Sequence, residues 1–225
     1  MSDSAVPFDY PRIVTKRLYG SEEFIHMEPI GNLTVEDYWA WAHSALSSNV
    51  ERGIVAEFLV AAALDVARGN NVRDPWADSD VIVPDGITPE GMIHIEVKSG
   101  SYIQDWDQKD FSRIVFSRLR GHAVAIDGSG ILAELNESPG GKTYKSHVFV
   151  LCLQKHRDQD SFNILDIDQW DFFVLSRAEV IELSRTGDSL SLKRITHQDN
   201  FAPTPYEQLA SQIRLKYKEW RAVAP

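Results

Sequence analysis

The sequence has a single cysteine, no long apolar run and fewer basic than acidic residues. One thiol, Cys152, cannot form a disulfide within the chain, which excludes a disulfide-stabilised scaffold. No apolar run approaches the roughly 20 residues of a membrane-spanning helix. The first residues also lack the basic and then apolar pattern of a secretory leader. We therefore expect no membrane association and a cytoplasmic protein.

The shortage of basic residues bears on nucleic-acid binding. The chain has 23 Lys and Arg against 33 Asp and Glu, a formal net charge of -10. Affinity for phosphates comes largely from Lys and Arg, so a strong freestanding nucleic-acid binder is disfavoured. A metal-dependent nuclease is not excluded, because its metal site is itself a group of carboxylates. A homodimer or a protein partner would then supply additional basic surface.

The length of 225 residues and the hydrophobic content of 43% are ordinary for one globular domain. We divide it into an N-terminal arm and helix (1–48), a core (49–185), and a C-terminal strand and helix (186–225). Cys152 lies in an apolar strand pattern and is expected in the core, because no basic partner marks it as a nucleophile. No repeat, heptad or zinc-type spacing is present.

Residues 78–100 contain the pattern around which the chain is organised. Two apolar runs, 81–83 and 92–97, flank a polar turn, which predicts a β-hairpin with a longer loop. Alternation in the second strand places Glu96 and Lys98 side by side on one face. Asp80 opens the first strand and would lie opposite them. An Asp, a Glu and a Lys that converge in this way can hold a hard divalent cation and activate a water beside it.

Asp80 and the Glu96-Val97-Lys98 tripeptide resemble the motif of the PD-(D/E)XK nuclease superfamily, with the resemblance specific over residues 49–104. Ser79 stands where many members have Pro. The resemblance implies a restriction-endonuclease-like α/β fold, with a mixed central sheet flanked by helices. It also implies Mg²⁺, for which Mn²⁺ can substitute, held by Asp80, Glu96 and the Val97 carbonyl. Lys98 would act on the transition state of phosphodiester hydrolysis, most often of DNA, with RNA not excluded.

A helix is predicted from Val50 to about Arg68, with Asn49 as its cap. Glu57 lies off the apolar stripe of this helix, between small residues. In the superfamily the helix before the hairpin often carries a Glu that completes the metal site, and Glu57 resembles that residue. The alternative is an ordinary solvated helix Glu.

The segment after the hairpin supplies candidates for substrate binding. Gln104 follows Lys98 at a position where several branches of the superfamily place a polar residue, although a capping or turn role is equally consistent. Residues 107–157 are the most basic section of the chain. Four of its cations are assigned to phosphate binding: Lys109, Arg113, Lys142 and Lys145. The GGKT sequence at 140–143 is rejected as a nucleotide-binding loop, because Asn136 replaces the required Gly.

The remaining patterns predict further helices and strands. A helix begins at Thr34, and its aromatic face is expected to pack in the core. Residues 111–119 fit either a helix or a strand. Strands are predicted at 145–154, 166–175 and 189–195. Helices are predicted at 177–183, with Ser176 as the cap, and at 206–220.

Two functions follow from these patterns. The first is a Mg²⁺-dependent nuclease. The alternative is a non-catalytic nucleic-acid-binding or assembly subunit that retains the fold, which the acidic charge favours and the intact Asp-Glu-Lys set disfavours.

Overall fold

The computed structural model describes residues 13–26, 31–126, 132–135, 141–197 and 201–223. It is a mixed α/β structure built on a four-stranded sheet. The strand order is β1 (Val81–Pro84), β2 (Met92–Ser101), β7 (Val148–Gln154) and β8 (Trp170–Ser176). β2 and β7 are parallel, whereas the β1–β2 and β7–β8 pairs are antiparallel, so the central sheet is mixed.

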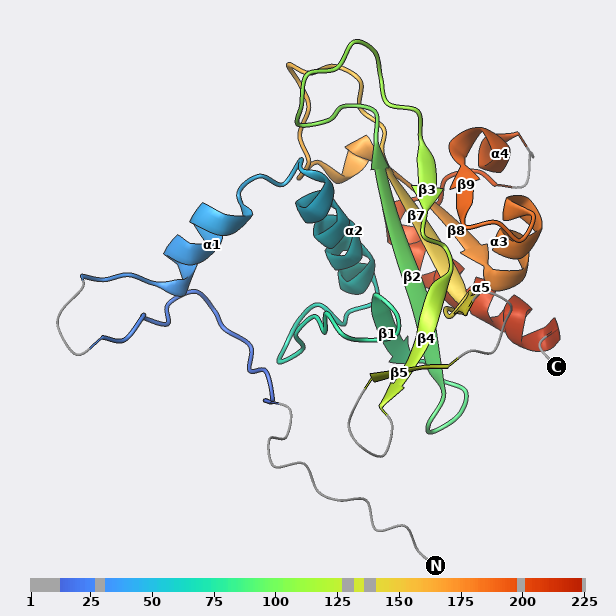
Figure 1. The fold of residues 1–225 in the computed structure, drawn as a ribbon, viewed down its shortest axis with the longest axis horizontal. Coiled ribbons are helices and arrows are strands. Elements are labelled where there is room, and N and C mark those ends of the chain that lie inside the picture. The colour runs from blue at the N-terminus through green and yellow to red at the C-terminus, as the bar shows by residue number, and fades with distance from the viewer. Residues whose placement is uncertain (1–12, 27–30, 127–131, 136–140, 198–200, 224–225) are drawn as a thin grey trace, which may run out of the picture.

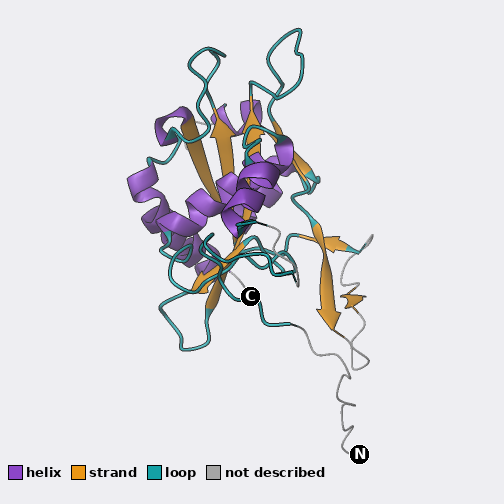
Figure 2. Ribbon diagram, turned by 90° about the vertical axis from the view of Figure 1, so that its left-hand side faces the viewer, coloured by secondary structure: helices purple, strands orange, loops and turns teal. Residues whose placement is uncertain are grey.

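Both faces of this sheet are covered (Figure 1, Figure 2). Helices α2 (Asn49–Ala63) and α5 (Leu209–Val223) share an apolar core with one face of the sheet. On the other face lie α3 (Arg177–Ser184), α4 (Leu192–Thr196) and a two-stranded ribbon of β3 (Val115–Ser117) and β9 (Ser189–Ser191). Every residue of β7 is buried, as expected for an interior strand with apolar side chains on both faces.

The connection between the parallel strands β2 and β7 contains β3, β4 (Gly121–Ile126), β5 (Leu132–Leu135) and β6 (Lys142–Thr143). The last three form a small sheet in the order β5-β4-β6. Two 3-10 turns (Ile167–Gln169 and Tyr206–Gln208) precede β8 and α5. Within the described ranges, no helix combines the length and apolarity needed to cross a membrane.

Several local predictions are confirmed. β1 and β2 form the predicted hairpin. Thr34 and Asp37 form a reciprocal capping box at the start of α1 (Val35–His43), and Ser176 caps α3 with Glu179. Cys152 is fully buried, and burial raises the pKa of its thiol, as expected for a core residue without nucleophilic character.

Other boundaries were wrong or are now settled. The cap of α2 is Ser48, whose side chain accepts from the Glu51 N–H, and the helix ends at Ala63 because Asp65 has a left-handed backbone (φ 60°). The undecided segment 111–119 contains strand β3. The strand predicted at 189–195 ends at Ser191, where α4 begins. Residue 140 of the GGKT sequence lies outside the described residues.

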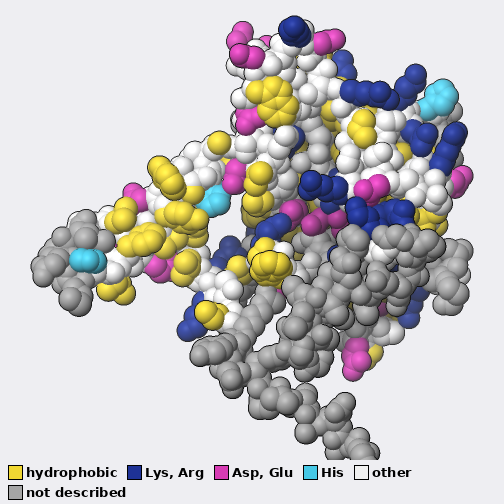
Figure 3. All heavy atoms as spheres, in the orientation of Figure 1, with side chains coloured by type: hydrophobic (Ala, Val, Ile, Leu, Met, Phe, Trp, Pro, Cys, Tyr) yellow, Lys and Arg dark blue, Asp and Glu magenta, His cyan; other side chains and the backbone are white. Residues whose placement is uncertain are grey.

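The aromatic face of α1 does not pack in the core, contrary to the prediction. No α1 residue is buried, and the Trp41 side chain is 86% exposed. Figure 1 shows α1 away from the four-stranded sheet, and Figure 3 shows apolar side chains gathered on this arm. Helical periodicity identifies an apolar face but does not supply the surface that covers it.

Candidate active site

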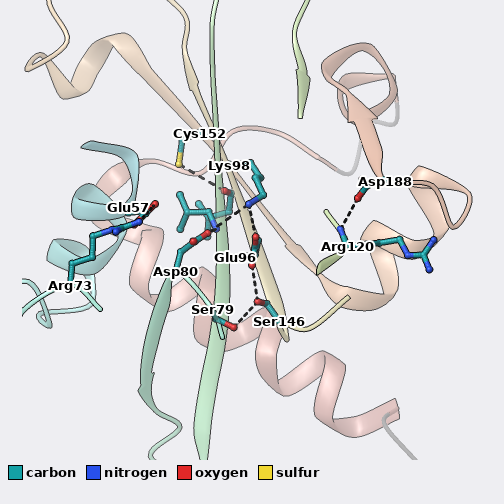
Figure 4. Close-up of polar contacts among 12 residues, drawn as sticks. Glu57, Arg73, Ser79, Asp80, Glu96, Lys98, Arg120, Ser146, Cys152 and Asp188 are labelled. Atoms are coloured by element: carbon teal, nitrogen blue, oxygen red, sulfur yellow. Dashed lines mark hydrogen bonds and ion pairs between the residues drawn. The ribbon is translucent and has the colours of Figure 1, made fainter. Parts of the chain in front are cut away.

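The register of the β1–β2 hairpin brings the predicted carboxylates together. Val81 pairs with Ile95, so Asp80 and Glu96 occupy the next facing positions. The Asp80 Oδ2 atom accepts a hydrogen bond of 2.8 Å from the Val97 N–H. This bond fixes the Asp80 side chain against the second strand (Figure 4).

Lys98 lies beside both carboxylates. Its ammonium donates to Glu96 Oε1 and lies 3.9 Å from Asp80 Oδ2. The three side chains are between 16% and 25% exposed, so their interactions are only partly screened by water. The structure therefore brings together Asp80, Glu96 and Lys98, the three residues that the hairpin pattern predicts to converge.

The surroundings of Glu96 disfavour its ionised form. Burial, followed by the charge of Asp80, raises the pKa of Glu96, while Lys98 and a hydrogen bond from Ser146 lower it by less. One ammonium thus does not fully compensate two adjacent carboxylates in a half-buried site. A divalent cation would offset the remaining repulsion.

The raised pKa of Glu96 predicts a pH-dependent stability. A carboxyl whose folded-state pKa lies above its usual value of 4.5 stabilises the fold below that value, and this contribution is lost as the pH rises through the folded pKa. Without metal, the wild type should therefore lose stability relative to Glu96→Gln over this rise. Thermal melts of both proteins in EDTA, from about pH 4 to pH 7, measure the difference. A difference that stays constant across this range would contradict the assignment.

Buried hydroxyls extend the site beyond the predicted residues. Ser146 Oγ donates to Glu96 Oε2 at 3.3 Å and lies 2.9 Å from Ser79 Oγ, which is 3.3 Å from His94 Nδ1. Burial lowers the pKa of His94, and it is the first cause that lowers the pKa of His147 to about 4. Burial therefore disfavours the charged form of both imidazoles.

The carboxylate of Glu57, the residue predicted to complete the metal site, is paired with an arginine. Its carboxylate receives two hydrogen bonds from the Arg73 guanidinium, one of them 3.0 Å long from Nη2 to Oε1. The Asp80 charge also contributes to the raised pKa of Arg73. This ion pair joins α2 to the loop that contains Arg73, and no local sequence pattern predicts it.

The donor set fits Mg²⁺. Within the described part of the chain, no group of three or more His, Cys, Asp or Glu side chains is placed to hold one ion. Mg²⁺ commonly uses one or two protein carboxylates and keeps several waters, so Asp80 and Glu96 could serve as its protein ligands. For Val97 the structure shows a backbone N–H bonded to Asp80, and the role of its carbonyl stays a prediction.

Gln104 joins the start of α2 to the end of β2. Its Oε1 accepts from Arg52 Nη1 at 3.2 Å, and its Nε2 donates to the Ser101 carbonyl at 2.7 Å. Arg52 is buried, with its Nη2 also bonded to Asn49. These contacts correspond to the turn role considered for Gln104; they do not test substrate binding.

The four predicted phosphate-binding cations differ in their surroundings. Lys145 Nζ lies 3.8 Å from Asp78, and Lys142 Nζ lies 3.9 Å from Asp188. Lys109 and Arg113 are exposed. The charges of Lys142 and Lys145 are therefore partly neutralised by nearby carboxylates.

Comparison with protein-family models, curated proteins and solved structures finds no match to this chain. Inference about function therefore depends on the geometry and chemistry of the site.

Proposed function

We propose that this protein is a Mg²⁺-dependent nuclease that hydrolyses phosphodiester bonds of DNA, with a restriction-endonuclease-like fold. The observation that carries the proposal is the facing pair Asp80 and Glu96 with the Lys98 ammonium beside both. The antiparallel hairpin, the parallel strand β7 and the preceding helix α2 support the fold assignment.

Asp80 and Glu96 would hold the cation, and the raised pKa of Glu96 supports this role because a bound cation would favour its ionised form. When bound, Mg²⁺ supplies a water of lowered pKa and polarises the phosphoryl oxygen. Lys98 cannot ligate a cation, so its ammonium is assigned to the charge that develops on the phosphoryl oxygens. Ser146 orients Glu96 through its hydrogen bond. The metal-ligand role of Glu57 stays a prediction. In this structure its carboxylate accepts a hydrogen bond from Arg73.

Nicking of supercoiled plasmid by the wild-type chain tests the function directly. We expect nicking with Mg²⁺ or Mn²⁺ and none with EDTA. The acidic net charge of -10 favours the alternative, a non-catalytic nucleic-acid-binding or assembly subunit. That alternative predicts DNA or protein binding without cleavage under any divalent metal. Cleavage of RNA in place of DNA would correct the substrate while retaining the reaction.

Metal binding should also stabilise the folded protein. At a Mg²⁺ concentration ten times its Kd, linkage gives about 1.4 kcal/mol, or an increase in Tm of about 3 to 5 °C for a chain of this size. Asp80→Asn should remove this response, because it removes one of the two proposed carboxylate ligands. Differential scanning fluorimetry with and without Mg²⁺ measures both proteins.

Asp168→Asn is the matched control for this measurement. Asp168 is exposed in the turn before β8, so the same chemical change should leave the metal response intact. An unchanged response in Asp80→Asn would place the metal site elsewhere.

A further inference from the structure

The β3–β9 ribbon has one buried face and one exposed face. Phe116 pairs with Leu190, and both side chains are buried over the central sheet. The flanking pairs, Val115 with Ser191 and Ser117 with Ser189, lie on the opposite face, where all but the half-buried Ser191 are exposed. This face presents mainly small hydroxyl side chains.

The ribbon lies next to the candidate active site. A Cβ atom placed on Gly100 would meet Ile114 Cγ2 at 3.2 Å and Phe116 Cε1 at 3.5 Å, so the ribbon packs closely on β2 at this glycine. Side chains of alternate residues in a strand lie on the same face of the sheet, so Gly100 belongs to the same face as Glu96 and Lys98. The ribbon therefore packs on the face of the sheet to which Glu96 and Lys98 belong.

Basic residues flank the exposed face of the ribbon at both ends. The hydrogen bonds from Leu192 N to the Ile114 carbonyl and from Leu119 N to the Asp188 carbonyl, each 3.2 Å, extend the pairing of the strands. Three exposed cations stand at these two ends: Arg113 and Lys193 at one, and Arg118 at the other.

None of these three cations has a carboxylate within ion-pair distance among the described residues. In a chain of net charge -10, cations without neighbouring carboxylates indicate a surface suited to an anionic ligand. The nearby Asp188 is already engaged, since it accepts from the Arg120 N–H at 2.9 Å and lies 3.9 Å from Lys142 Nζ (Figure 4).

Arg118 adds an independent observation. Its backbone φ is 58°, in the left-handed region where a residue with a Cβ is uncommon and glycine is favoured. Strained positions of this kind cluster at functional sites. An exposed Arg at this position therefore supports a role for its guanidinium.

The basic surface continues from Lys193 into an adjoining hollow of about 460 Å³. Its lining contains four basic side chains and a single carboxylate, Glu182; the basic residues are Arg185, Lys193, Arg194 and His197. Figure 3 shows Lys and Arg side chains gathered over the region of α4 and β9. A phosphate group would meet several donors in this hollow.

We propose that the β3–β9 ribbon binds the sugar–phosphate backbone of duplex DNA and guides it to Asp80, Glu96 and Lys98. Arg113, Arg118 and Lys193 would contact phosphates. Serine hydroxyls are also common phosphate donors. This inference rests on the proposed nuclease function and assigns its substrate-binding surface.

The test compares two double variants that change the net charge equally. Arg118→Gly with Lys193→Ala removes two ribbon cations, and glycine retains the left-handed backbone at 118. Lys16→Ala with Lys218→Ala is the control, since both lysines are exposed and lie on the N-terminal arm and α5. Binding of a short fluorescent DNA duplex is measured by anisotropy across salt concentrations, in a Lys98→Met background with Mg²⁺ to prevent cleavage.

The ribbon variant should bind DNA more weakly, and the slope of log affinity against log salt should become shallower by about 2, roughly one for each lost phosphate contact. The control should keep the slope, and both variants should retain the reference Tm. If wild type cleaves DNA but the ribbon variant keeps the slope, or the control loses as much, the ribbon assignment is wrong and the nuclease function stands. If wild type neither binds nor cleaves DNA, both proposals fail.

Discussion

Glu96→Gln is expected to abolish Mg²⁺-dependent DNA cleavage, with a loss of at least about 10³-fold in rate, or about 4 kcal/mol of transition-state stabilisation. The substitution keeps the side chain's shape but removes a charge that the cation needs. The measurement is the initial rate of plasmid nicking by equal concentrations of wild type and variant.

Stability separates loss of the site from loss of the fold. Without metal, Glu96→Gln should be no less stable than wild type near neutral pH, because the ionised carboxyl is disfavoured by burial and by Asp80. Glu90→Gln is the matched control, an exposed glutamate in the turn of the same hairpin. Full cleavage by Glu96→Gln would show that the activity uses other residues.

Lys98→Met should lower the cleavage rate by about 10²- to 10³-fold, equivalent to roughly 3 to 4 kcal/mol, while DNA and metal binding change little. The reason is that an ammonium stabilises charge that appears only in the transition state. Methionine retains most of the aliphatic stem. The measurements are single-turnover cleavage rates at saturating DNA and the Mg²⁺-induced change in Tm.

The structure adds a second effect of this variant. Lys98 donates to Glu96 and lies near Asp80, so its removal leaves the two carboxylates without their ammonium. The metal-free variant should be less stable, and its Mg²⁺-induced rise in Tm should be at least as large as that of wild type. Lys218→Met, an exposed lysine on α5, is the control. A rate equal to that of wild type would exclude Lys98 from the reaction.

The parts of the fold that the sequence predicts are those determined by neighbouring residues. Alternation along residues 92–98 predicts the strand and the shared face of Glu96 and Lys98, and the hairpin turn then places Asp80 opposite. Thr34 and Ser176 mark helix starts because their side chains bond the backbone three residues later.

Contacts between distant segments could not be predicted in this way. Ser146 reaches Glu96 from a position 50 residues away, and Arg73 meets Glu57 from a loop with no regular pattern. The exposure of α1 was also missed, because amphipathicity is the same whether or not a partner surface exists. β9 is only three residues long, and Leu192 continues its apolar pattern into a helix.

The parallel pairing of β2 with β7 has a consequence for how the protein folds. Ile95 pairs with Val148, and none of the described residues in the long connection between them adds a strand to the four-stranded sheet. Such non-local pairings are slow to form, because the chain loses loop entropy before the contacts compensate for it. During synthesis, Glu96 emerges well before the Ser146 hydroxyl that binds it. A hairpin that forms in the nascent chain has an unpaired β2 edge until β7 is available, and in that interval the edge is open to pairing with other chains.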